Sequence, residues 1–186
     1  MAALEAIGLV ELTSIGVGMK VEDAMLKAAS VELLVARTIC SGKYLIVIGG
    51  EVSAVRASVG AGAELAEDAL IEERVIPHVH PAVFPAIGLS VAVPDEPVEA
   101  LGVIETFSAS SVIEAADAAA KAASVTLFRV HLAMAVGGKG FLLMVGDVAA
   151  VEAAVEAGAA VAAASGILVS QFVIRGPRRE LLEECI

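Results

Sequence analysis

The sequence is poor in aromatic side chains: it has no Trp, one Tyr and five Phe, although 58% of its residues are hydrophobic. Its apolar residues are therefore mostly small, with Ala and Val the commonest. Small side chains let helices and sheets approach closely, and they leave flat surfaces that can pack against a neighbour. This composition is unusual for a free monomer and favours a subunit of a larger assembly.

Cysteine is scarce as well. Cys40 and Cys185 are far apart, and no Cys-x-x-Cys or Cys/His spacing is present. One chain therefore offers no zinc motif. A disulfide is not expected in a cytoplasmic protein, and Cys185, next to the last residue, has no predicted role.

Basic residues are few: 12 Lys and Arg stand against 23 Asp and Glu, for a net charge of −11. Nucleic-acid binding needs clustered Lys and Arg, so it is not expected. The mean hydropathy of +0.86 raises the question of a membrane. However, the uncharged stretch 75–94 contains four prolines, and Ser165-Gly166 interrupts the stretch 157–174. Without a signal-peptide pattern at the start, we expect a cytoplasmic protein with no membrane partner.

What the sequence does contain is an internal repeat. Residues 7–31 align with residues 101–125 without a gap, and ten of the 25 pairs are identical. The two copies are offset by 94 residues. An offset of this size indicates a duplicated domain, because the period of a solenoid repeat is roughly 20–50 residues. We therefore predict two like domains, residues 1–90 and 91–186, connected through the proline-rich segment 77–97.

Each copy has the pattern of a β-α-β-β-α-β unit. The predicted strands are 6–11, 32–39, 43–48 and 72–76 in the first copy, and 100–105, 126–134, 139–145 and 167–174 in the second. The predicted helices are 19–29, 52–69, 112–123 and 148–164. This order is the split-βαβ, or ferredoxin-like, arrangement of the α+β class, with both helices on one face of an antiparallel sheet. On the first helix of each copy, Asp23 with Lys27 and Asp117 with Lys121 form favourable (i, i+4) pairs.

Three motifs recur in both copies: a Glu that ends the first strand, DAxxKAAxV in the first helix, and Gly-Lys at the start of the third strand. Together with the segments AIGLVELTSIGVGMKVEDAMLKAASVELL and CSGKYLIVIGG, they resemble bacterial microcompartment shell proteins of the tandem-domain, trimer-forming class. Within that class, TICSGKYLIVIGG is most similar to the propanediol-utilisation T-type members, whose corresponding turn carries a cysteine.

The resemblance implies an assembly. Three chains, each with two BMC domains, would form a flat pseudohexameric disc that contacts other shell proteins at its edge. The turns before the third strands would line the central axis, namely Cys40, Ser41 and Gly42 in the first copy and Val136, Gly137 and Gly138 in the second. The edge contacts would come from Lys27, Lys121 and Arg175, with His78 as the approximate counterpart of Arg175 in the first copy.

The same resemblance implies a [4Fe–4S] cluster at the axis, held by Cys40 of each chain, for electron transfer across the shell. Such a cluster usually takes four Cys thiolates, and one chain offers one at this turn. Threefold symmetry supplies three, which leaves one iron for an outside ligand. Ser41 departs from the pattern, because the similar proteins have proline there.

Other interpretations stay open. If Cys40 is only a small, half-buried residue at a strand end, the opening on the axis is a metabolite pore with no cluster. A ferredoxin-like oligomer that binds a ligand is a further alternative. His78 and His80 could share one face as metal ligands, although a solvated or interface role is expected. No acid/base or nucleophile constellation and no complete phosphate loop is present, so we do not expect an enzyme.

Overall fold

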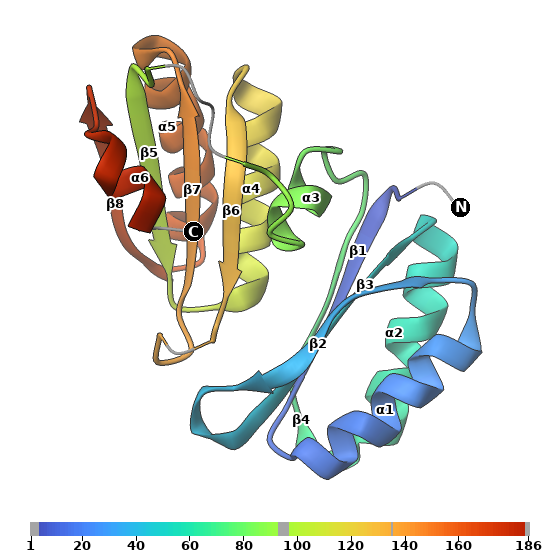
Figure 1. Ribbon diagram of the computed structural model, residues 1–186. Helices are drawn as coiled ribbons and strands as arrows, with labels where there is room; N and C mark the ends of the chain where they lie inside the picture. Colours follow the sequence, from blue (N-terminus) through green and yellow to red (C-terminus); the bar gives the residue numbers. More distant parts are fainter. Residues whose placement is uncertain (1–3, 93–96, 135, 185–186) are drawn as a thin grey trace. The chain divides into compact units, whose positions relative to one another are not determined.

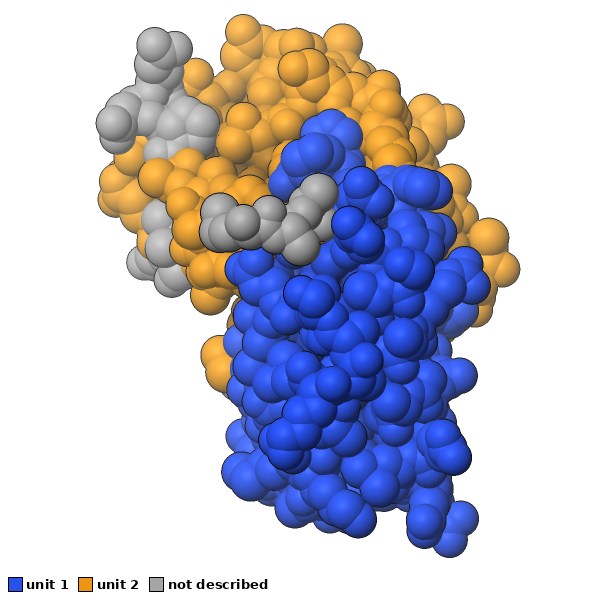
Figure 2. Space-filling view, turned by 90° about the vertical axis from the view of Figure 1, so that its right-hand side faces the viewer, with its two compact units in different colours: residues 1–81 blue, residues 82–186 orange. Residues whose placement is uncertain are grey.

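The computed structural model describes residues 4–92, 97–134 and 136–184. The chain divides into two compact units, residues 1–81 and 82–186 (Figure 2). Unit 1 contains the first copy of the repeat and unit 2 the second.

Unit 1 is a four-stranded antiparallel sheet with two helices on one face (Figure 1). Along the chain it contains β1 (Ala6–Leu12), α1 (Ile15–Ala28), β2 (Glu32–Ile39), β3 (Lys43–Gly50), α2 (Val52–Ala66) and β4 (Leu70–Ile76). Short 3-10 turns occupy Cys40–Gly42 and Glu67–Ala69. The strand order in the sheet is β2-β3-β1-β4.

Unit 2 repeats this plan and adds two short helices. Its elements are α3 (Val83–Ile87), β5 (Ala100–Thr106), α4 (Ala109–Ala122), β6 (Thr126–Leu132), β7 (Gly140–Gly146), α5 (Val148–Ala164), β8 (Leu168–Arg175) and α6 (Arg179–Glu184). The strand order is β6-β7-β5-β8, which matches that of unit 1. The predicted α+β class and the β-α-β-β-α-β order of both copies are confirmed.

The unit boundary differs from the predicted one. Residues 82–90 belong to unit 2, whereas the sequence predicts them in the first domain. The reason is that α3 packs against β6 and α4. Part of the predicted connecting segment, residues 93–96, lies outside the described residues.

The duplication extends to irregularities of the backbone. The pairing of β2 with β3 shifts register between Leu33 and Val35, and the pairing of β6 with β7 shifts between Leu127 and Arg129. The central strands show a second matched shift, at Glu11/Leu12 in β1 and at Glu105/Thr106 in β5. The two sheets therefore share the positions of their register shifts as well as their topology.

Both first helices begin earlier than predicted. Helix α1 starts at Ile15 rather than residue 19, and α4 at Ala109 rather than residue 112. The cause is N-capping: the hydroxyl of Ser14 accepts a hydrogen bond from the backbone N–H of Val17, and that of Ser108 accepts one from Ser111. Elsewhere the last turn of the predicted helix 52–69 is a 3-10 turn, and β6 ends at Leu132 instead of residue 134.

The core of unit 1 lies between the sheet and its two helices. The close packing of α2 on β1 leaves room only for a glycine at position 8. A Cβ added at Gly8 would stand 2.6 Å from Cγ2 of Val59 on α2. In unit 2 a Cβ at Gly102 would stand 2.8 Å from Met144 and Val155. Contacts this short do not occur between real side chains, so the two glycines set how closely the second helix packs on each sheet.

One buried polar group of unit 1 should weaken it. The hydroxyl of Ser58 on α2 is buried and has no hydrogen-bond partner among the described residues. Its repeat counterpart in unit 2 is Ala154, also buried. Because an unsatisfied buried hydroxyl carries an uncompensated desolvation cost, we expect Ser58→Ala to stabilise unit 1 by about 1 kcal/mol in chemical denaturation.

The control for this prediction is Ser53→Ala, which changes an exposed serine of the same helix and should alter stability by at most a few tenths of a kcal/mol. A loss of stability in Ser58→Ala would show that the hydroxyl has a partner in the folded protein.

Candidate functional site

The first predicted axial turn connects β2 to β3 through a left-handed backbone. Ser41 has φ 67° and Gly42 has φ 73°. A Cβ added at Gly42 would meet no heavy atom within 4 Å, so conformation rather than space selects glycine there. Proline, which the resemblance leads one to expect at position 41, is locked near φ −65° and cannot adopt the conformation of Ser41.

Cys40 opens this turn as a half-buried thiol that forms no disulfide among the described residues. The other cysteine, Cys185, lies outside the described residues. Within residues 4–92, 97–134 and 136–184 of one chain, no group of three or more His, Cys, Asp or Glu side chains could hold a metal ion.

The second predicted axial turn is longer. Gly137 and Gly138 have φ 67° and 85°, and neither has a neighbour within 4 Å of an added Cβ. His131 stabilises the start of this loop: its ring lies 4.7 Å from that of Phe141, and its Nε2 lies 2.7 Å from the carbonyl oxygen of Met134. A carbonyl can only accept, so Nε2 carries the proton. Residue 135, part of the predicted turn, lies outside the described residues.

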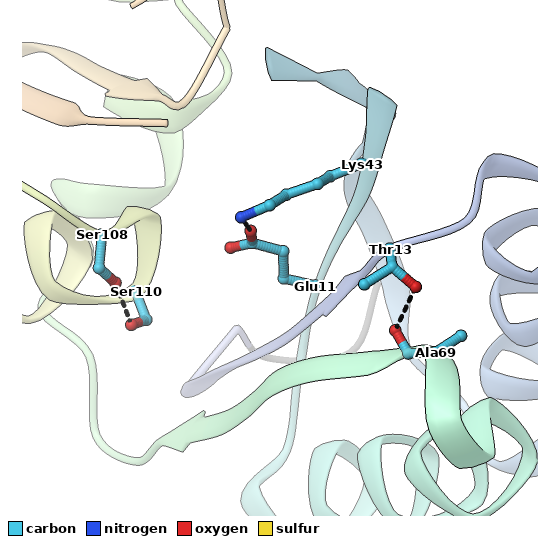
Figure 3. Close-up of polar contacts among 6 residues, drawn as sticks. All are labelled: Glu11, Thr13, Lys43, Ala69, Ser108 and Ser110. Atoms are coloured by element: carbon cyan, nitrogen blue, oxygen red, sulfur yellow. Dashed lines mark hydrogen bonds and ion pairs between the residues drawn. The ribbon is translucent and has the colours of Figure 1, made fainter. Parts of the chain in front are cut away.

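An ion pair stands directly after each turn. The Nζ of Lys43, the first residue of β3, lies 2.8 Å from Oε1 of Glu11 on β1 (Figure 3). In unit 2, the Nζ of Lys139 lies 2.7 Å from Oε1 of Glu105, and the hydroxyl of Ser170 donates to Oε2 of the same carboxylate. The hydrogen bond from Lys139 lowers the pKa of Glu105. Each pair ties the segment after the turn to the central strand of its sheet.

The two ion pairs were not predicted from the sequence, although both partners of each pair recur in the repeat. Glu11 and Glu105 recur in the two copies, and so do Lys43 and Lys139. What the sequence lacked was the strand register, which pairs β1 with β3 and places the end of one beside the start of the other. A Glu and a Lys that recur together in a repeat are therefore candidates for one ion pair.

The predicted edge lysines end the first helix of each unit. Nζ of Lys27 lies 2.5 Å from the carboxylate of Asp23, and Nζ of Lys121 lies 2.6 Å from that of Asp117. The two predicted (i, i+4) pairs are thus confirmed. The side chains of both lysines are exposed, as a contact with another molecule requires.

Arg175, the third predicted edge residue, is the last residue of β8 and forms an ion pair with Glu152 on α5. The strand register corrects its counterpart in unit 1. Ile76 pairs with Ile7 and Ile174 pairs with Leu101, so Arg175 corresponds to Pro77, and His78 corresponds to Gly176. His78 and Gly176 share a positive φ, 55° and 57°, and unit 1 has no basic residue at the position of Arg175.

None of the helices in the described part of the chain combines the length and the apolarity needed to cross a membrane.

The two units match one protein family. The BMC domain matches residues 6–79 and again residues 100–177, which contain both sheets and their covering helices. Each match includes one predicted axial turn and one of the Glu–Lys pairs.

Individual proteins show the same relation. The bacterial microcompartment shell protein PduT of Citrobacter freundii is 43% identical over 182 residues, which cover 98% of this chain and 98% of PduT. The shell protein EutM of Salmonella typhimurium is 48% identical over 85 residues, 86% of its own length but 46% of this chain.

Solved structures agree with these sequence matches. A microcompartment protein from Desulfitobacterium hafniense DCB shares 47% identity and superposes with a TM-score of 0.90, over 96% of this chain and 98% of its own. A fused, permuted hexameric shell protein of the RMM microcompartment is 25% identical, with a TM-score of 0.61 over 86% of this chain and 82% of its own.

Proposed function

This chain belongs to the BMC-domain family of bacterial microcompartment shell proteins, and from that premise we propose that three copies form one flat tile of such a shell. The tile is a ring of six BMC domains, two from each chain, and it contacts other shell proteins at its edge. Its role is structural rather than enzymatic. The family favours this function over that of a ferredoxin-like oligomer that binds a ligand.

The observation that carries the proposal is the equivalence of the two units. They share strand order, register shifts and the ion pair beside the turn. EutM, which matches only 46% of this chain, is itself about one such unit long. Like units favour contacts of one type, and such contacts form a ring when the rotation from one unit to the next closes. Three chains with two units each then complete six positions.

Electron microscopy and native mass measurement test the ring. We expect flat discs with the mass of three chains of 18.8 kDa, and lateral sheets of discs at higher concentration. A single chain, or an assembly whose chain number is not a multiple of three, would overturn the proposal.

We further infer that the axis of the ring holds a [4Fe–4S] cluster, bound by Cys40 of each chain. The kind of donor supports this, because thiolates are the usual ligands of iron–sulfur clusters. The position of the donor supports it too. Cys40 is the first residue of the Cys40–Gly42 turn, and a Cβ added at Gly42 would meet no heavy atom within 4 Å. When bound, the cluster would supply one-electron transfer. Each chain would supply one thiolate, from Cys40, and a turn that is followed by the ion pair of Lys43 with Glu11.

A ring without the cluster is the alternative. In unit 2 the equivalent turn contains Val136, Gly137 and Gly138 and offers no thiol. If Cys40 binds no iron, the opening that these turns surround serves small metabolites instead.

Lys27 is proposed as an edge contact between tiles, with Lys121 and Arg175 in the same role in unit 2. We expect Lys27→Ala to raise the protein concentration needed for sheets about two- to fivefold, the equivalent of one lost exposed charged contact, while three-chain tiles remain. Because the pair of Lys27 with Asp23 is exposed, its loss should cost the fold only a few tenths of a kcal/mol. Electron microscopy over a concentration series measures the effect.

Lys20→Ala is the matched control, since Lys20 is an exposed lysine on the same helix. Equal loss of sheets in both variants would point to net charge rather than to a contact at Lys27. Dissociated tiles in Lys27→Ala would place this lysine inside the tile instead of at its edge.

A further inference from the structure

Unit 1 has an apolar surface that its own residues do not cover. Ile15, Met19 and Leu26 are exposed on α1, and Leu33 is exposed on the neighbouring edge strand β2. Their spacing of four and seven residues places the three α1 side chains on one stripe of the helix. We call the surface formed by these four residues the α1–β2 face.

Three of the four counterpart positions in unit 2 are buried, and the fourth, Ala120, is half-buried. Met19 is 59% exposed, whereas its counterpart Ile113 is 0% exposed. Leu33 is 38% exposed, and its counterpart Leu127 is 2% exposed. The difference lies in α3, which packs against β6 and α4, the equivalents of β2 and α1 (Figure 1).

Helix α6 is the repeat equivalent of α3. Helix α3 follows β4, the last strand of the first copy, as α6 follows β8, the last strand of the second. The register that equates Ile76 with Ile174 also equates Val83 with Leu181 and Phe84 with Leu182. Both equated pairs are apolar.

The two helices differ in how much of this apolar surface is covered. Phe84 and Leu182 are both buried, and Leu182 packs against Leu101 and Phe128 of its own sheet. Val83 is 0% exposed, but Leu181 is 41% exposed. Leu181 of α6 is therefore exposed at the position where Val83 of α3 is buried. Unit 1, in turn, exposes the α1–β2 face, which is equivalent to the surface of β6 and α4 on which α3 packs.

We propose that α6 of one copy covers the α1–β2 face of a second copy, with Leu181 in the place that Val83 takes beside β6 and α4. This inference rests on the proposed ring of three chains and adds the segment that joins one chain to the next. The contact is head-to-tail, since it uses different surfaces of the two copies, and such a contact ends growth only by closing into a ring.

Two variants of the full chain test the contact from its two sides. Leu181→Glu and Met19→Glu each place a charge in the proposed interface, and both positions are solvent-exposed within one chain, so each unit should fold as before. We expect self-association to weaken ~30-fold or more per contact, since each variant removes one large apolar side chain from an interface. Sedimentation should show single chains, with unchanged circular dichroism.

The matched control is Glu183→Ala on the same helix. Glu183 is exposed, and its counterpart Pro85 stays exposed beside β6 and α4, so this variant should sediment as the wild type does. A wild type of three chains whose Leu181→Glu or Met19→Glu variant also stays at three chains would overturn the α6 contact and leave the ring standing. A wild type that sediments as one chain would overturn the ring itself, and the contact with it.

Discussion

Replacing Cys40 with Ser is expected to remove the iron and sulfide from the protein completely while the three-chain tile persists. A serine hydroxyl is a poor ligand for a cluster that takes thiolates, and each chain contributes one thiol to the proposed site. The turn itself should survive the change, because its left-handed residues Ser41 and Gly42 are unaltered and the ion pair of Lys43 with Glu11 remains. Iron and sulfide are quantified after anaerobic purification, beside the visible absorbance.

Cys185→Ser is the control for this experiment, because it removes the only other thiol of the chain. It should keep four irons and four sulfides for every three chains, the content of one [4Fe–4S] cluster. An anaerobic wild type that forms tiles without iron would contradict the cluster and favour the metabolite pore.

The second large effect is expected from Gly158→Ala on α5. A Cβ at Gly158 would stand 2.7 Å from the backbone carbonyl oxygen of Ala115 on α4, and 2.8 Å from Cδ1 of Ile104. A backbone carbonyl within a helix cannot rotate away, so α4 and α5 must separate. We expect unit 2 to lose about 2–3 kcal/mol, net of the helix propensity that alanine gains. Its Tm should fall by roughly 10 °C or more.

Gly62→Ala is the matched control, since Gly62 is the repeat counterpart of Gly158. There an added Cβ would stand 2.6 Å from Cγ of Met25, the middle of a flexible side chain that can adopt another rotamer. The change should therefore cost less than about 1 kcal/mol. Equal Tm losses in the two variants would show that the helices of the two units are packed equally tightly.

The fold was largely predictable from the sequence because each unit alternates short apolar strands with Ala-rich helices, and because the copies confirm each other. The errors lie where a local polar group decides the outcome. Helices α1 and α4 start early because Ser14 and Ser108 cap them, a signal that was visible as an identical pair in the repeat. The placement of α3 in unit 2 was not predictable, because the apolar residues of Val83–Ile87 do not specify which sheet they cover.

The candidate site was predictable in part. The sequence places Cys40 at a turn between two strands, and the structure adds the left-handed conformation of Ser41 and the ion pair that follows it. Cross-strand partners such as Lys43 and Glu11 are 32 residues apart, so only the register brings them together. Lys27, Lys121 and Arg175 are proposed to contact other molecules. Such contacts could be predicted only from the resemblance of the sequence to other shell proteins.

Native mass spectrometry of the anaerobically purified wild-type protein tests the central claim most directly, because one spectrum reports both chain number and bound cluster. The account predicts one dominant species with the mass of three 18.8 kDa chains plus a single [4Fe–4S] cluster, and the same species without the cluster in Cys40→Ser. A wild-type spectrum of single chains, or of three chains that carry neither iron nor sulfide, would contradict it.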